Sequence, residues 1–318
     1  MEDNTEREPF IQYAENLYCV DLEVFGPKRV CAYVFVDKEE VAIIDCGPEP
    51  ALAKIDAFLH GIGKSLKQVS LLLLSHIHLD HAGGAGTLAG ISPSVRIGVH
   101  PAGIKHLIDP SKLAAGSAEV YGPERMKGMG KVESVPQPNM FEYTDGMEIK
   151  FGPLRFTALE THGHAYHHYS FMDRGNRRLF AGDACGVSYD NQDGIFKILP
   201  TAPTQFDPTS WRETTAKLKK ENPAEIYITH FGRWKPEDLY PLMDEYLDAC
   251  EAICAEAAKG ENIPETVLNE LVVLCNRKMR MNETPDGKYF HDFNISSQGM
   301  IYLAQKLKKN KENDLPRE

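Results

Sequence analysis

The sequence contains one dense cluster of residues whose side chains bind metal ions. His76, His78, Asp80 and His81 lie within six positions, directly after the apolar run at 71–74. Because His76 and His78 are two residues apart, extended backbone at a strand end directs both side chains to the same side. Asp80 and His81 lie on the turn that follows and face a second point nearby. Neutral imidazole and carboxylate are ligands of zinc, iron(II) and manganese, so the H-x-H-x-D-H spacing predicts a metal site.

Further candidate ligands follow the ends of other predicted strands. The run T-H-G-H at 161–164 follows the strand at 154–160, and Asp183, His230 and Asp45 each end a later or earlier strand. Active sites of layered α/β folds gather at strand ends. We therefore expect these segments to converge on one site.

The hydrophobic pattern predicts the elements that must position these residues. Strands and helices alternate along the chain, which is typical of layered α/β architecture. The predicted strands are 17–46 (three strands), 70–75, 95–99, 141–150, 153–159, a hairpin of 169–173 with 177–182, and 225–229. The predicted helices in this part are 51–63, a start near 81–88, and 209–220.

Two stretches lack a periodic pattern, and the last part of the chain is helical. Residues 109–138 contain Pro, Gly, Lys and Met, which predicts a segment without regular structure that acts as a lid on the substrate side. Residues 186–208 are predicted to be a loop. Beyond residue 235, helical patterns occupy 239–259, 264–281 and 296–309. The prediction is a catalytic domain at 1–235, with the 109–138 insertion, and a helical appendage at 236–318.

Composition narrows the class of protein. The 318 residues carry 35 basic and 46 acidic side chains, a formal charge of −11 that disfavours nucleic acid as a partner. The beginning of the sequence is acidic and polar, unlike a secretory signal, and no apolar run approaches the roughly 20 residues of a membrane span. Seven scattered Cys without a C-x-x-C pair are typical of reduced core thiols. We expect a cytoplasmic protein with a small-molecule substrate and no membrane partner. Apolar residues of the appendage suit a homodimer interface as well as intrachain packing.

The order of these motifs between residues 41 and 232 resembles the metallo-β-lactamase-fold superfamily, and within it the glyoxalase II-like branch. The resemblance implies an α/β fold, an αββα four-layer sandwich with the metals at one edge of the two sheets. It implies two divalent metal ions, zinc first, with iron or manganese as alternatives. Carried over by position, His76, His78 and His164 hold the first metal. Asp80, His81 and His230 hold the second, Asp183 bridges both, and Asp45 supports the histidine-rich loop by hydrogen bonds.

The second histidine motif departs from the family pattern. Many relatives carry T-P-G-H-T-P-G-H, whereas residues 161–168 read T-H-G-H-A-Y-H-H. His164 keeps the T-x-G-H register and is the predicted ligand, while His168 is predicted to support the site from outside the ligand set. His162 and His167 are interpreted as bystanders. Tyr189, six residues after Asp183, is a candidate hydrogen-bond donor to a developing oxyanion, the alternative being an ordinary loop aromatic.

The predicted site is suited to hydrolysis. Two divalent metals lower the pKa of a shared water and so provide a bridging hydroxide at neutral pH, and Asp80 is predicted to accept a proton as well as bind metal. The predicted substrate is a small ester-like molecule, thioester first and lactone second. Two alternatives stay open: a mononuclear iron persulfide dioxygenase that leaves the second metal site unused, and a phosphodiesterase.

Overall fold

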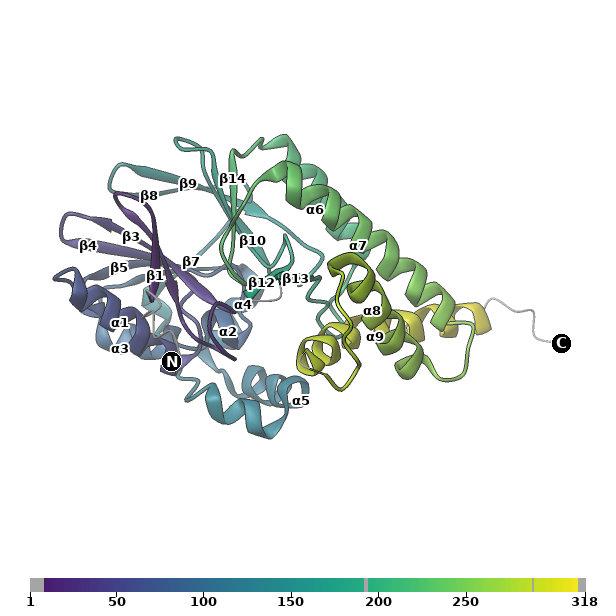
Figure 1. Cartoon of the computed structure of the whole chain (residues 1–318). Coiled ribbons are helices and arrows are strands. Elements are labelled where there is room, and N and C mark those ends of the chain that lie inside the picture. Colours follow the sequence, from purple (N-terminus) through teal and green to yellow (C-terminus); the bar gives the residue numbers. More distant parts are fainter. Residues whose placement is uncertain (1–8, 192–193, 288, 314–318) are drawn as a thin grey trace, which may run out of the picture.

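Two β-sheets lie face to face at the centre of the molecule (Figure 1). The computed structural model describes residues 9–191, 194–287 and 289–313. The first sheet has the order β1-β2-β3-β4-β5-β6-β7, and the second has the order β15-β14-β11-β10-β9-β8. The strands of the first sheet are β1 (Phe10–Ala14), β2 (Leu17–Asp21), β3 (Cys31–Asp37), β4 (Glu40–Ile44), β5 (Val69–Leu73), β6 (Arg96–Val99) and β7 (Met140–Glu142). Those of the second are β8 (Glu148–Phe151), β9 (Leu154–Glu160), β10 (Tyr169–Asp173), β11 (Arg178–Gly182), β14 (Glu225–Ile228) and β15 (Arg233–Trp234).

Parallel pairing brings the carboxyl ends of the strands that precede the predicted metal ligands to one edge. Strands β4, β5, β6 and β7 pair in parallel, and β11 pairs in parallel with β14. The carboxyl ends of parallel neighbours lie at the same edge of a sheet, so the segments that follow β4, β5, β11 and β14 emerge together. The topology therefore accounts for the convergence of the metal-ligating residues.

Helices cover the outer face of each sheet and complete four layers. The nine helices in the described part of the chain are α1 (Leu52–Gly61), α2 (Leu79–Ala82), α3 (Ala85–Ile91), α4 (Pro101–Ile108), α5 (Ser111–Gly128), α6 (Pro208–Lys220), α7 (Pro236–Ala257), α8 (Ile263–Met279) and α9 (Phe290–Asn313). Ile55 of α1 and Leu88 of α3 pack against Ile43 and Leu72 of the first sheet. Trp211 of α6 belongs to the core cluster of the second sheet. The predicted αββα sandwich is confirmed.

Aromatic side chains fill the space between the two sheets. Phe35 of β3 packs edge-on against Phe156 of β9 and Phe180 of β11, with ring centroids 5.0 and 5.2 Å apart. All three side chains are fully or almost fully buried. Edge-to-face aromatic pairs stabilise a core by about 0.5–1.5 kcal/mol beyond the area that they bury. This rigid layer holds the two groups of strand ends in fixed relative positions.

Three segments differ from the sequence-based expectation. The expectation for residues 109–138 is a lack of regular structure, but Ser111–Gly128 forms α5, with non-helical backbone at Gly122 before Pro123. The expectation for residues 186–208 is a loop, but β12 (Val187–Asn191) and β13 (Gly194–Ile198) form a hairpin. The strand predicted at 141–150 is divided between the two sheets as β7 and β8, which the turn at Asp145–Gly146 connects. In these segments the polar and apolar residues alternate without a clear period, so the sequence does not reveal the helix or the strands.

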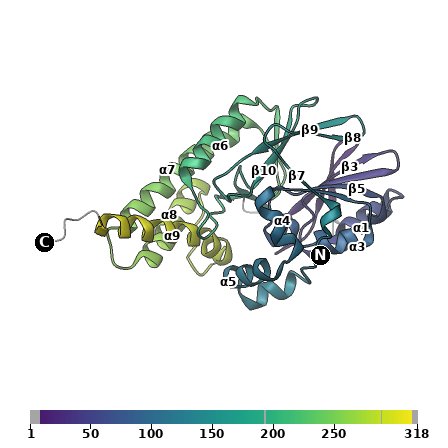
Figure 2. The same cartoon turned by 180° about the vertical axis from the view of Figure 1, so that it is seen from behind.

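The C-terminal helices share one core with the second sheet. The buried cluster of Leu179 and Ile226 in that sheet continues into Leu247 of α7, Leu271 of α8 and Met300 of α9. In Figures 1 and 2 this helical region extends from α6 and reaches the same edge of the sandwich as α5. All seven cysteines are buried and free, which confirms their interpretation as core thiols. Within the described ranges, no helix combines the length and hydrophobicity needed to cross a bilayer.

One lysine is buried where the hairpin meets these helices. The side chain of Lys197 in β13 is 5 % exposed, and its Nζ lies 3.4 Å from the ring centroid of Trp234 without a hydrogen-bond partner among the described residues. Burial lowers the pKa of Lys197 to about 7, although Cys185 and Asp238 oppose the shift. Because the ammonium form loses its hydration, the folded protein favours the neutral amine.

We expect Lys197→Met to stabilise the protein most at low pH. The unfolded chain binds a proton at Lys197 up to about pH 10, whereas the folded chain releases it near pH 7. The cost of the lysine is therefore fully present below pH 7 and declines as pH rises, by at most about 1.4 kcal/mol per pH unit. Urea unfolding between pH 6 and 10 measures the gain, with exposed Lys219→Met as control. A gain in the free energy of unfolding that is the same at every pH would contradict this account.

Candidate metal centre

Five chain segments meet at one edge of the two sheets and bring together the predicted ligands. Asp45 follows β4, residues 75–81 follow β5, residues 161–168 connect β9 to β10, Asp183 follows β11, and His230 follows β14. Among the described residues, four sets of side chains place one ligand atom each within 4.8 Å of the others in the set, and three of these sets consist of predicted ligands. These three sets are His76 with His78 and His164, His76 with His81 and Asp183, and Asp80 with His81 and His230.

The first set consists of three imidazoles whose nitrogens face one point. His76 Nε2 lies 2.9 Å from His78 Nδ1, which lies 3.0 Å from His164 Nε2. Hydrogen bonds to the other ring nitrogen fix the orientation of two of these rings. His164 Nδ1 donates to the carbonyl of Pro200, and His76 Nδ1 lies 3.0 Å from Ser75 Oγ. Such hydrogen bonds select the tautomer that leaves the facing nitrogen free to bind a cation.

The second set combines one carboxylate with two imidazoles. His230 Nε2 lies 3.3 Å from Asp80 Oδ2 and 3.2 Å from His81 Nε2. His230 Nδ1 donates to the carbonyl of Arg29 at 3.0 Å, and His81 Nδ1 donates to Asp45 Oδ2 at 2.9 Å. Both rings therefore present Nε2 lone pairs to the same point as the Asp80 carboxylate.

The carboxylate of Asp183 lies between the two sets. Its Oδ1 is 3.4 Å from His81 Nε2 and 3.5 Å from His230 Nε2, while its Oδ2 is 3.5 Å from His164 Nε2. One oxygen thus faces each set. This is the arrangement that a bridging carboxylate requires.

Asp183 is held in place by His168 and by the backbone at Gly182. His168 is fully buried, and its Nε2 accepts a hydrogen bond from the Asp183 amide at 3.1 Å. Gly182 has φ +53°, and a Cβ there would lie 2.6 Å from His168 Nε2 and 2.7 Å from the Cβ of Ser75. Only glycine therefore permits this close approach of β11 to the histidine-rich loop.

The electrostatics of the centre favour a bound cation. Burial and the surrounding imidazoles lower the pKa of His78 to about 3, and burial likewise lowers the pKa of His76 and of His164. Against the effect of burial, the neighbouring histidines hold the pKa of Asp80 and of Asp183 below the ordinary carboxyl value. The first set thus presents neutral imidazoles beside ionised carboxylates, whereas in the second set, against the effect of burial, Asp183 and Asp80 raise the pKa of His81 and of His230.

The residues present fit a pair of metal ions. Asp80 Oδ1 and Asp183 Oδ1 are buried and have no hydrogen-bond partner among the described residues. Unpartnered buried carboxylate oxygens are costly unless a cation satisfies them. Three neutral imidazoles on one side, and one carboxylate with two imidazoles on the other, are donor sets that zinc, iron(II) and manganese accept.

His162 of the second motif lies apart from both sets. His162 is 40 % exposed and faces Glu160, whose Oε1 is 3.3 Å from His162 Nε2 and 3.5 Å from His100 Nε2. His100 Nδ1 already accepts a hydrogen bond from the Ala102 amide, which places the proton of the neutral ring on Nε2. We therefore interpret this trio as a carboxylate between two imidazoles at ion-pair distance rather than a further metal site.

His167 is buried beside the first set and lines the adjoining cavity. Its ring centroid is 5.5 Å from that of His78, and its Nδ1 has no hydrogen-bond partner among the described residues. Burial and nearby imidazoles lower the pKa of His167 to about 2. It therefore presents a neutral ring to the cavity wall.

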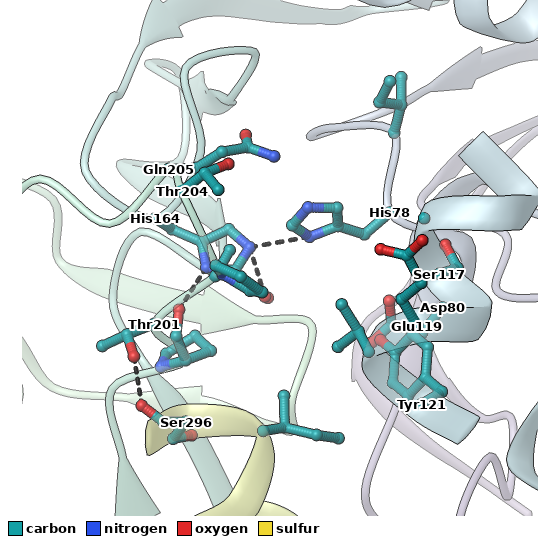
Figure 3. Close-up of a pocket in the computed structure, with 18 of the residues that line it drawn as sticks. His78, Asp80, Ser117, Glu119, Tyr121, His164, Thr201, Thr204, Gln205 and Ser296 are labelled. Atoms are coloured by element: carbon teal, nitrogen blue, oxygen red, sulfur yellow. Dashed lines mark hydrogen bonds and ion pairs between the residues drawn. The ribbon is translucent and has the colours of Figure 1, made fainter. Parts of the chain in front are cut away.

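One aromatic residue beside the centre is not among those that the sequence singles out. Tyr121 of α5 lines the cavity together with Asp80 and Asp183, and Figure 3 shows it beside Asp80. Burial and the Asp80 carboxylate raise the pKa of Tyr121 well above its ordinary value. The spacing of Leu113, Val120 and Tyr121 is the helical signal that could have identified this face. Tyr189 belongs to β12, and its side chain lies outside the described part of the molecule.

Comparison with known proteins identifies the family. The model of the metallo-β-lactamase superfamily matches residues 26–230, so the chain belongs to this superfamily. The metallo-β-lactamase fold-containing protein ST1585 of Sulfurisphaera tokodaii is 24 % identical over 224 residues, 70 % of this chain and 78 % of that protein. A hydroxyacylglutathione hydrolase of Idiomarina loihiensis is 25 % identical over 199 residues, 63 % of this chain and 59 % of that enzyme.

A solved structure shares the whole architecture. The metallo-β-lactamase family protein TTHA1429 of Thermus thermophilus superposes with a TM-score of 0.68 at 18 % identity. The match covers 96 % of this chain and 97 % of that one. The likeness therefore extends through the C-terminal helices as well as the sandwich.

We expect His164→Ala to reduce metal binding and His162→Ala to leave it unchanged. His164 Nε2 faces His78 and Asp183, whereas His162 faces Glu160. Loss of a ligand should reduce metal affinity by more than the roughly 10- to 100-fold that loss of an outer partner costs. Competition with a chelator, read by elemental analysis, measures both variants. Equal retention of metal by the two variants would contradict the assignment of His164.

Proposed function

We propose that the protein is a dinuclear metal-dependent hydrolase of a small ester-like substrate, with a thioester first and a lactone second. The observation that carries the proposal is the position of Asp183, with one carboxylate oxygen facing each of two complete ligand sets. A persulfide dioxygenase with one iron would use His76, His78 and Asp183 and leave the second metal site unused. The complete second set of Asp80, His81 and His230 favours hydrolysis.

The proposed metals are two divalent ions, zinc first. His76, His78 and His164 would hold one ion, Asp80, His81 and His230 the other, and Asp183 both. When bound, such a pair supplies a water of lowered pKa as nucleophile and a Lewis acid for the acyl carbonyl.

The side chains of this chain hold the charges and protons around that reaction. Asp45 fixes the His81 ring by accepting a hydrogen bond from its Nδ1, which leaves Nε2 to bind a metal ion. Asp80 has one oxygen directed at His230 and one unpartnered oxygen that can accept a proton from the attacking water. Tyr121 presents a neutral hydroxyl beside Asp80, positioned to donate to an oxygen of the substrate.

The similarity to a hydroxyacylglutathione hydrolase supports a thioester as the first substrate class to test, since that enzyme by its name hydrolyses an acylated glutathione. The finer likeness to the glyoxalase II-like branch is part of this proposal. The seven free thiols support a reducing compartment, and we propose the cytoplasm.

We expect Asp183→Ala to lose metal and activity together. The substitution removes the one carboxylate that faces both ligand sets, so the ions lose their shared partner. Metal per chain and kcat/KM on acyl thioesters and lactones should both fall, kcat/KM by at least about 100-fold. Asp248→Ala, an exposed carboxylate that pairs with Arg212, is the control.

An Asp183→Ala variant with unchanged metal content and full activity would overturn the bridging role. A wild-type protein that holds a single iron and consumes oxygen with a persulfide would replace the hydrolase proposal with the dioxygenase.

A further inference from the structure

A cavity of about 400 Å³ opens beside the candidate metal centre. His78, Asp80 and Asp183 form its inner end, and it extends away from the sheets between α5, the β12–β13 hairpin and the beginning of α9. In Figure 3, Ser117, Glu119 and Tyr121 face Thr201 and Ser296 across it. Its volume lies within the range of pockets that hold small organic molecules.

Helix α5 lines one side of this cavity with apolar positions among polar and charged ones such as Ser117 and Glu119. Leu113, Gly116 and Val120 follow one another at helical spacing on the face that lines the cavity. No residue of α5 is fully buried. Among the described residues, Val120 belongs to none of the three core clusters. Leu113 also packs against the core of the first sheet, so Gly116 and Val120 are the α5 positions whose apolar surface is left for an occupant of the cavity.

The opposite wall combines apolar side chains with polar ones such as Thr201 and Ser296. Ile198 of β13, Val187 of β12 and Ile295 of α9 line it. The carboxylate of Asp292 is 8 % exposed and is paired with Arg29 at 3.1 Å. This charge is therefore neutralised within the protein and does not require a charged ligand.

An aromatic contact between distant segments fixes α5 at the wall of the cavity. Phe25, in the connection between β2 and β3, stacks on Tyr121 with ring centroids 5.6 Å apart. The guanidinium of Arg125 lies 4.4 Å above the Phe25 ring. Val120 also accepts a hydrogen bond from Gln298 of α9 through its carbonyl oxygen. These contacts attach α5 to both the sandwich and the C-terminal helices, so the cavity has defined walls.

We propose that this cavity binds an apolar acyl group of the substrate, with the acyl carbonyl at the metal edge and Gly116 setting the length of chain that fits. The inference rests on the proposed hydrolase function and names its substrate class. In the reaction the acyl–oxygen or acyl–sulfur bond breaks and the oxygen of water bonds to the acyl carbon. One proton of that water passes to the leaving alcohol or thiol, and the acid product keeps the other oxygen-bound proton until it ionises.

The first experiment measures kcat/KM of the metal-loaded protein on a series of acyl thioesters and 4-nitrophenyl esters from acetyl to dodecanoyl. Burial of each added methylene should raise kcat/KM about fourfold until the cavity is full. The value should then level off or fall. A profile that is flat, or that falls from acetyl onward, would overturn the proposal.

Gly116→Leu tests where the acyl group lies. A Cβ at Gly116 meets no heavy atom within 4 Å, and leucine favours the helix more than glycine does, so folding is not threatened. The larger side chain should shift the optimum to shorter acyl chains and reduce kcat/KM for decanoyl esters at least tenfold more than for acetyl esters. Gly128→Leu, on the same helix but away from the cavity lining, is the matched control and should keep the wild-type profile.

Val120→Asn supplies a second, independent variant. It places an amide on the apolar face and should reduce kcat/KM for decanoyl esters at least tenfold more than for acetyl esters. An equal effect on short and long chains, or a Gly116→Leu profile identical to wild type, would contradict the assignment.

Binding of decanoate, measured by calorimetry on the same proteins, separates the two proposals. If no ester is hydrolysed but decanoate binds and Gly116→Leu weakens it about tenfold, the hydrolase proposal fails and the apolar cavity stands. If esters are hydrolysed without preference for long chains and decanoate does not bind, the cavity proposal fails and the hydrolase stands.

Discussion

The buried carboxylate of Asp45 accepts four hydrogen bonds, and the geometry of the site depends on them. The donors are the amide and the hydroxyl of Ser75, the hydroxyl of Thr229 and the Nδ1 of His81, all at 2.8–2.9 Å. Ser75 follows β5 in the first sheet and Thr229 follows β14 in the second, so one side chain joins the ends of both sheets. A buried carboxylate without such partners would be strongly destabilising, so the convergence of these donors stabilises the fold at the place where the candidate ligands meet. His81 is the link between the two, because its other nitrogen faces Asp80, Asp183 and His230.

The sequence predicts the site where residues that bind metals, such as histidine and aspartate, follow buried strands. Histidines and aspartates at the ends of buried strands predicted the segments that meet, and the parallel pairing of β4 with β5 and of β11 with β14 is the reason that they meet. The sandwich could be predicted because strands such as β5 contain continuous apolar runs, which are typical of strands buried on both faces. These elements depend on strong local patterns, which a single sequence reveals.

The sequence was less informative where tertiary contacts determine the structure. No residue of helix α5 is fully buried, so apolar residues do not recur along it with a clear helical period. Gly122 and Pro123 also interrupt the helix. Its position comes from contacts with Phe25 and Gln298, which are distant in the sequence. For the same reason, the sequence does not indicate that Tyr121 lies beside the site. Tyr189 was a candidate only because it is close to Asp183 along the chain. The β12–β13 hairpin likewise owes its place to packing against the C-terminal helices.

The central claim is that two metal ions share Asp183, and anomalous diffraction at the metal absorption edge tests it most directly. Crystals of the protein purified without added metal should show two peaks per chain. One peak should lie among His76, His78 and His164, and the other among Asp80, His81 and His230, with the Asp183 carboxylate between them. A single peak at the first set, with the second set empty in metal-saturated crystals, would contradict the dinuclear account.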